Sequence, residues 1–77
     1  MSSNIRQRFG RAVRRRRREL GLSQEDLALA AGLHRTYISD VERGARNVSL
    51  ENIAKIARSL QLSLPDLFGK YVCEPDQ

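Results

Sequence analysis

The side chains best suited to recognising another molecule fall in the segment 35–43. Ile38 and Val41 are spaced as residues of one helical face, so a helix over this segment turns its polar side chains outward. That outward face presents Arg35, Thr36, Ser39, Asp40 and Arg43, with Tyr37 at its boundary. A guanidinium group binds phosphate oxygens and guanine edges through two parallel hydrogen bonds. The segment therefore predicts a surface that binds a polyanion.

The net charge of the chain supports a polyanionic partner. The 77 residues include 14 Lys and Arg against 9 Asp and Glu, a formal net charge of +5. Residues 1–23 contain eight arginines and one acid, so positive charge is concentrated at one end. Charge alone does not separate nucleic acid from an anionic membrane, because long-range attraction draws a cation to both. The dominance of arginine over lysine favours nucleic acid.

The same residues offer little to an enzyme. His34 is the only histidine, and no second metal ligand lies at a suitable helical spacing from it. A serine, a histidine and an aspartate in one short helix do not form a catalytic triad, and the five glycines occur singly rather than in a phosphate-binding loop. We therefore expect no catalytic residue, no metal and no cofactor. His34 is expected to cap a helix or to lie beside a phosphate.

Helical periodicity runs through the chain, and no stretch shows the two-residue alternation of a strand. Five helices are expected, over residues 4–20, 24–31, 34–43, 50–60 and 63–71. Gly21 and Gly44 follow the first and third of them, where a left-handed residue commonly ends a helix. A chain of this length forms one compact domain. We therefore expect a single all-α domain over 1–77, with an ordered core of about residues 4–71.

The cysteine content and the apolar segments predict where the protein resides. Cys73 is the only cysteine, so the chain forms no internal disulfide and fits a reducing cytoplasm. No apolar stretch approaches the roughly 20 residues that cross a bilayer. Residues 1–20 lack the apolar segment of a signal peptide. We expect a cytoplasmic protein with no membrane partner.

The last two predicted helices carry more apolar side chains than so small a core can cover. A two-fold interface between identical subunits would bury the surplus. The residues expected at that interface are Leu62, Leu64, Leu67, Phe68 and Tyr71. Such a homodimer would hold its two exposed helices about 34 Å apart, one turn of duplex DNA, and would read a pseudo-palindrome.

Residues 24–44 contain a short helix, a turn at Gly32 and a second short helix, which is the helix-turn-helix arrangement. The stretches Leu20-Gly-Leu-Ser-Gln-Glu-Asp-Leu-Ala, Ala31-Gly, Tyr37-Ile-Ser and Glu42-Arg-Gly resemble the Cro and phage-repressor family over about residues 5–70. More narrowly, residues 33–50 resemble the controller proteins of bacterial restriction-modification systems. The resemblance implies a five-helix, lambda-repressor-like domain with the helix-turn-helix at its second and third helices.

The resemblance also implies roles for individual positions. Arg35 is expected to read guanine from the major groove, and Arg17 and Glu42 are expected to form a structural ion pair between the first and third helices. The other positions expected at DNA are Gln24, Thr36, Tyr37, Ser39, Asp40, Arg43, Arg46 and Asn47.

Three of these positions have alternative interpretations. Gln24 could be an ordinary first residue of its helix, and Tyr37 could lie at the edge of the core. Asp40 could accept a hydrogen bond from cytosine or restrain Arg43 three residues along the helix.

The function implied is sequence-specific binding of double-stranded DNA by a homodimer. The regulator would activate and repress its own promoter and that of the endonuclease, with RNA polymerase as a further partner. Two alternatives stay open. One is a prophage repressor or antitoxin-type regulator of the same fold, and the other is a module that bridges proteins without binding DNA.

Overall fold

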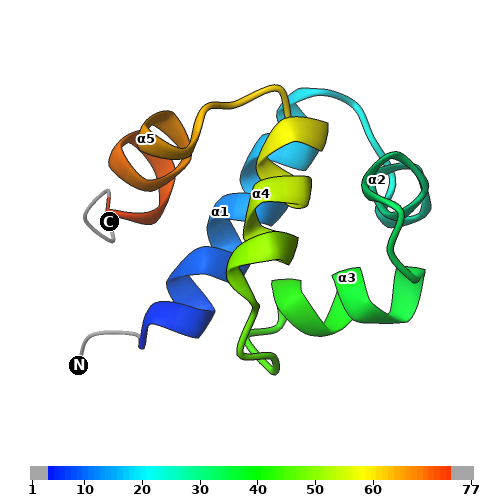
Figure 1. Ribbon diagram of the computed structural model, residues 1–77, viewed down its shortest axis with the longest axis horizontal. Coiled ribbons are helices and arrows are strands. Elements are labelled where there is room, and N and C mark those ends of the chain that lie inside the picture. Colours follow the sequence, from blue (N-terminus) through cyan, green and yellow to red (C-terminus); the bar gives the residue numbers. More distant parts are fainter. Residues whose placement is uncertain (1–3, 74–77) are drawn as a thin grey trace.

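Five helical segments follow one another in the computed structural model, which describes residues 4–73 (Figure 1). They are α1 (Ile5–Glu19), α2 (Gln24–Ala31), α3 (Arg35–Glu42), α4 (Leu50–Ser59) and α5 (Leu64–Asp66), which continues into the π-helix η1 (Leu67–Val72). The part of the chain that the structure describes contains no strand. The all-α, five-helix prediction is confirmed. Residues 1–3 and 74–77 of the predicted domain lie outside the described residues.

The ends of the helices are set by local hydrogen bonds. In α2, the Ser23 hydroxyl accepts from the Asp26 amide at 2.9 Å, and the Asp26 carboxylate accepts from the Ser23 amide at 3.0 Å. The bond from the Ser23 amide lowers the pKa of the Asp26 carboxyl group. His34 occupies the N-cap position of α3 as predicted, but its side chain makes no capping hydrogen bond. Side-chain caps also begin three other helices, at Asn4, Ser49 and Ser63.

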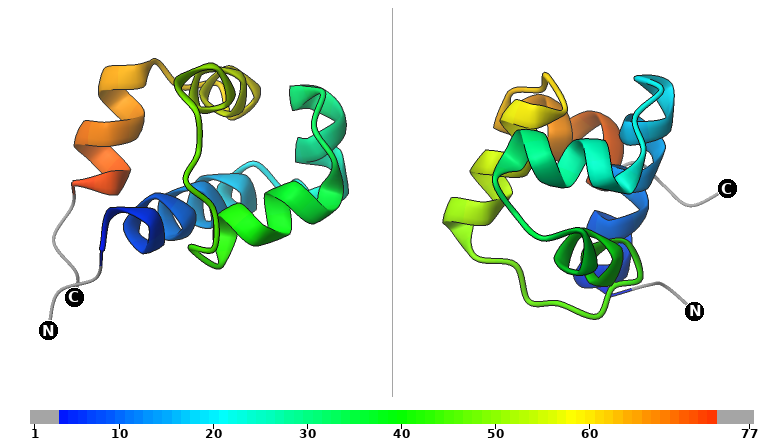
Figure 2. Two further views of the ribbon diagram at one scale, coloured as in Figure 1. Left: turned by 60° about the horizontal axis from the view of Figure 1, so that its bottom comes forward. Right: turned by 90° about the vertical axis from the view of Figure 1, so that its right-hand side faces the viewer.

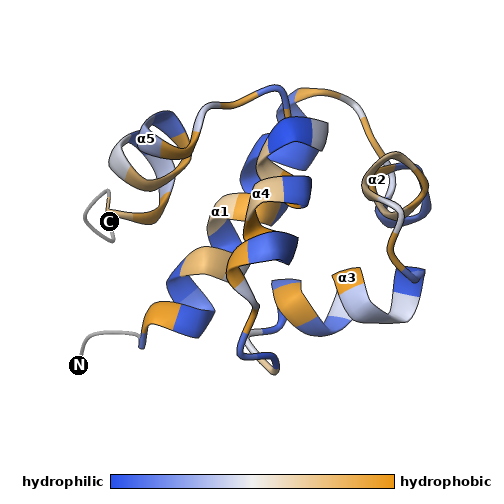
Figure 3. Ribbon diagram, in the orientation of Figure 1, coloured by the Kyte–Doolittle hydropathy of each residue, from blue (hydrophilic) through white to orange (hydrophobic). Residues whose placement is uncertain are grey.

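The helix-turn-helix pair lies at one side of the molecule, and α5 lies at the other (Figures 1 and 2). Between them, α1 and α4 contribute the centre of the core, where Val13, Ile56 and Leu60 are fully buried. Hydrophilic and hydrophobic residues alternate along the helices (Figure 3). The C-terminal end of α3 packs on α1 at Gly10, where a side chain would collide with the backbone of Val41 and Glu42. This close crossing fixes where α3 leaves the core.

Several arginines of α1 fasten the C-terminal part of the chain instead of forming a free basic surface. Arg8 donates through Nε to the carbonyl of Val72, and Arg16 does the same to the carbonyl of Leu60, both at 3.0 Å. The Tyr71 hydroxyl donates to the Glu19 carboxylate at 2.6 Å. That bond lowers the pKa of Glu19 and raises the pKa of the Tyr71 phenol.

The predicted dimer interface needs one correction. Leu67 is fully buried in the core of its own subunit, so its assignment to a subunit contact is wrong. The π-helix explains the error, because its wider turn directs Leu67 and Val72, five residues apart, into the core together. Phe68 stacks on Phe9 with 6.0 Å between ring centroids and remains partly exposed. Leu64 is 45% exposed.

Candidate nucleic-acid interface

The candidate interface is built on α3, which follows α2 after a turn of three residues. The turn begins at Gly32, whose positive φ of 70° is readily adopted by a residue without a Cβ atom. Ile38 and Val41 anchor α3 in the core with at most 1% of their surface exposed. The opposite side of α3 is uncovered by any other helix (Figure 2). The turn and the core contacts thus present a rigid polar face.

Three side chains of that face are available for binding. Arg35 and Thr36 are exposed, and Ser39 is partly exposed. Within residues 4–73, no side-chain hydrogen bond or ion pair engages any of the three. Such a free guanidinium group beside two hydroxyl groups can donate to guanine edges and to phosphate oxygens.

Arg17 and Glu42 lie where the sequence predicts a structural pair. Both residues are 8% exposed. Arg17 donates through Nε and Nη2 to the two carboxylate oxygens of Glu42, at 2.6 and 3.0 Å. Its Nη1 donates to the carbonyl of Leu22 at 2.8 Å. The hydrogen bonds to Glu42 raise the pKa of Arg17. This one guanidinium group therefore links α1, the α1–α2 connection and α3.

Gln24 takes part in the same cluster, which neither sequence interpretation anticipates. Its side-chain amide donates through Nε2 to Oε1 of Glu42 at 3.1 Å, and the residue is partly buried. The two residues are 18 positions apart. No local pattern in the sequence marks such a pair, because both residues are common on exposed helix surfaces. The predicted contact of Gln24 with phosphate stays a prediction.

A second cluster shapes the segment that follows α3. The Asp40 carboxylate accepts from Arg43 Nη2 at 2.5 Å and from Arg46 Nε at 3.3 Å. The Arg46 guanidinium group lies 5.0 Å above the centre of the Tyr37 ring. Asn52 of α4 donates to the Tyr37 hydroxyl at 3.0 Å. Tyr37 is thus held at the edge of the core, and Asp40 restrains two arginines. Asn52 is a contributor that the sequence analysis missed.

Two further features, a metal site and a membrane-spanning helix, are absent from the described residues. Among residues 4–73, no group of three His, Cys, Asp or Glu side chains is placed to hold a metal ion. No helix in that range is long and apolar enough to span a membrane.

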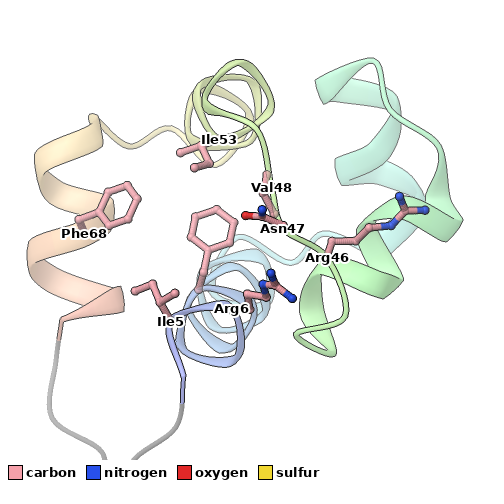
Figure 4. A pocket seen from close by; sticks show the side chains of 8 residues that line it. Ile5, Arg6, Arg46, Asn47, Val48, Ile53 and Phe68 are labelled. Carbon is pink, nitrogen blue, oxygen red and sulfur yellow. The ribbon is translucent and has the colours of Figure 1, made fainter.

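One hollow of about 130 Å³ opens between α1, the segment before α4, α4 itself and η1 (Figure 4). Apolar side chains of Ile5, Ile53 and Phe68 point into it, and Arg6 and Asn47 lie near its opening (Figure 4). Asn47, which the sequence predicts at DNA, thus lies at the edge of this hollow.

The fold and the exposed face of α3 together define a helix-turn-helix domain. The family model described as Helix-turn-helix matches residues 13–67, and the chain belongs to that family. Control protein C.BamHI of Bacillus amyloliquefaciens is 54% identical over 68 residues, covering 87% of this chain and 84% of that protein.

Solved structures agree with this relationship. The restriction-modification controller protein C.AhdI from Aeromonas hydrophila has 50% sequence identity and a TM-score of 0.78, with 80% of this chain and 94% of that chain covered. The controller protein C.Esp1396I was solved as a tetramer in complex with its natural 35 base-pair operator. It shows 33% identity and a TM-score of 0.83, with 90% of this chain and 91% of that chain covered.

Proposed function

We propose that this chain is a sequence-specific, double-stranded-DNA-binding regulator of transcription, and that it acts as the controller protein of a restriction-modification system. The observation that carries the proposal is the exposed polar face of α3, held rigidly by a buried apolar face. The similarity to control protein C.BamHI supports the narrower role. A prophage repressor or antitoxin-type regulator of the same fold is the alternative within this class.

In this proposal α3 enters the major groove, with Arg35 reading a base and Thr36 and Ser39 approaching bases or backbone. Arg43, Arg46 and Asn47 lie beside the phosphate backbone or the minor groove. Tyr37 and Asp40 act mainly by shaping the segment that carries Arg46. Regulation of its own promoter and of an endonuclease promoter, and contact with RNA polymerase, follow from the resemblance alone.

The proposal also covers the organisation of the protein. We propose one helix-turn-helix domain over 1–77 that regulates without catalysis and acts in the cytoplasm, where its DNA would be. Support comes from the match of the family model to residues 13–67.

We further propose a homodimer on a pseudo-palindromic operator, since two-fold symmetry in the protein requires it in the DNA. The apolar face formed by Leu50, Ile53, Leu64 and Phe68 would be its centre. Leu50 is 84% exposed at the start of α4, and Ile53, three residues further along α4, lines the hollow together with Phe68. Leu62 and Tyr71, both partly exposed, would lie nearer its edge.

Sedimentation equilibrium tests this face. We expect Leu50→Glu to convert the dimer into a monomer at concentrations where the unsubstituted protein is dimeric, because two like charges would face each other across the symmetry axis. Leu29→Glu is the matched control, since Leu29 is 83% exposed on α2, away from the face. If both variants stay dimeric, or both become monomeric, the proposed face is wrong.

Binding measurements against salt test the proposed function. An operator is first selected from random duplexes, and the affinity for it is compared with that for an unrelated duplex. We expect Arg35→Ala to weaken operator binding by about 10- to 100-fold with little effect on the unrelated duplex, because a bidentate contact to a base discriminates by about 1–3 kcal/mol.

Arg14→Ala is the control for charge, because Arg14 is an exposed arginine of α1, outside the proposed groove contact. It should weaken both duplexes alike. A protein that bridges other proteins without binding DNA would show neither selection of an operator nor a linear loss of log affinity with log salt. That result would refute the proposed function.

A further inference from the structure

The hydrogen bond from Gln24 to Glu42 has an unusual position in the helix-turn-helix. The turn at Gly32 joins the last residue of α2 to the start of α3. Gln24 is the first residue of α2 and Glu42 is the last residue of α3, so along the chain they are the positions furthest from that turn. Their bond of 3.1 Å therefore closes the third side of a triangle whose other sides are the two helices.

A triangle of this kind fixes an angle that a turn alone leaves adjustable. A turn of three residues holds only one end of each helix, and small changes in its dihedral angles move the far ends by several ångströms. Core contacts limit that movement, at Leu27 of α2 and at Ile38 of α3. The hydrogen bond at the far ends limits it further. Because α3 carries the polar face, its angle to α2 sets how Arg35, Thr36 and Ser39 meet any surface that both helices approach.

The acceptor is well suited to this purpose. Glu42 is held by two hydrogen bonds from Arg17, at 2.6 and 3.0 Å, so its carboxylate cannot swing away. Gln24 supplies a third donor, to the oxygen that Arg17 Nη2 also binds. Hydrogen bonds to a charged acceptor shielded from water are stronger than those between neutral exposed groups. The fixed carboxylate thus anchors the beginning of α2.

We propose that Gln24 is a positioning residue for DNA recognition, which sets the angle between α2 and α3 through Glu42. This inference rests on the proposed function, and it assigns Gln24 a role in selectivity. A residue that only contacts phosphate contributes equally to every duplex. A residue that orients the recognition helix contributes to the operator, whose base edges demand one orientation, and hardly to unrelated duplexes.

The test uses Gln24→Met, which keeps the length of the side chain and removes its N–H donors. Affinities are measured for the selected operator and for an unrelated duplex at one salt concentration. We expect about a tenfold loss on the operator, the scale of one hydrogen bond to a charged group, and less than about twofold on the unrelated duplex. Equal losses on both duplexes, or no loss on either, would overturn the proposal.

Gln24→Lys provides the rescue, because an ammonium group can donate to the same carboxylate. The ratio of operator affinity to unrelated affinity should return to within about twofold of the original, while both affinities rise through the added charge. A ratio as low as that of Gln24→Met would argue that the bond to Glu42 is not what matters.

A measurement on the free protein separates this inference from the proposed function. The Arg17 Nε–H group donates to Glu42 at 2.6 Å, and we expect this buried bond to slow its exchange with water enough for its signal to be followed in nitrogen-edited spectra. We expect Gln24→Met to shift this signal and to speed amide exchange in α3, while the urea midpoint changes little. An unchanged spectrum would refute the positioning role even if DNA binding is confirmed. Absence of operator selection would refute the proposed function and with it the role of Gln24 in recognition, whereas a shifted spectrum would still show that Gln24 positions α3 through Glu42.

Discussion

Glu42→Ala is expected to lower the free energy of unfolding by about 3–5 kcal/mol, because it leaves the buried Arg17 guanidinium group without its counter-ion. Arg17 would keep only the carbonyl of Leu22 as a partner in the cluster, and Gln24 would lose its acceptor. Small domains have total stabilities of about 5–15 kcal/mol. Urea denaturation followed by circular dichroism should therefore show a large shift of the midpoint, or a substantially unfolded protein.

Asp40→Ala is the matched control for this prediction. Asp40 is also an acid of α3 with two arginine partners, but the side chain of Arg43 is 62% exposed and that of Arg46 is 48% exposed. Exposed ion pairs contribute about 0–1 kcal/mol. A double replacement, Arg17→Met with Glu42→Leu, should restore much of the stability lost in Glu42→Ala, since no buried charge remains. Equal effects of Glu42→Ala and Asp40→Ala would contradict a special role for burial.

The elements that could be predicted from the sequence are those with local signals. Glycine after a helix and serine before one act within a few residues, so the predicted limits of α2 and α3 agree with the structure to within one residue. The apolar spacing that placed Ile38 and Val41 inside has the same local origin. The polar face of α3 follows directly from it.

The features that could not be predicted depend on partners distant in sequence. Gln24 forms a hydrogen bond with Glu42, 18 residues away, and Tyr37 forms one with Asn52, 15 residues away. No local sequence pattern predicts either pair. The sequence predicts Leu67 at the subunit interface with Leu64 and Phe68, because the last two predicted helices carry more apolar side chains than a small core can cover. In the structure η1 packs against α1, and Leu67 is directed into the core.

The concentration of arginine in residues 1–23 shows how composition can mislead about position. Arg17 forms a buried ion pair with Glu42. Arg8 and Arg16 donate hydrogen bonds to backbone carbonyl groups in the C-terminal half of the chain. Arg15 lies 5.0 Å above the ring of Tyr71. Their charges still contribute to the field around the molecule, but their guanidinium groups have structural partners. The specific contacts that we propose come instead from α3, whose net charge is small.

Gly10→Ala is the second substitution expected to have a large effect. A Cβ atom at position 10 would lie 2.7 Å from the carbonyl oxygen of Glu42 and closer still to that of Val41. Both obstacles are backbone atoms of a helix, so neither can rotate aside. Overpacking costs about 1–3 kcal/mol and occasionally more, and we expect the upper end here. The gain in helix propensity offsets about 1 kcal/mol, which leaves a net loss of about 2 kcal/mol or more in urea denaturation.

Gly69→Ala is the matched control for Gly10→Ala. Gly69 is also helical, but a Cβ atom there would meet nothing within 4 Å. That variant should be unchanged or slightly more stable, because alanine restricts the unfolded chain. The close crossing at Gly10 brings the end of α3 against α1, and it thereby keeps Glu42 within reach of Arg17. If Gly10→Ala were as stable as Gly69→Ala, the two helices could separate without loss, and the buried ion pair would not depend on their contact.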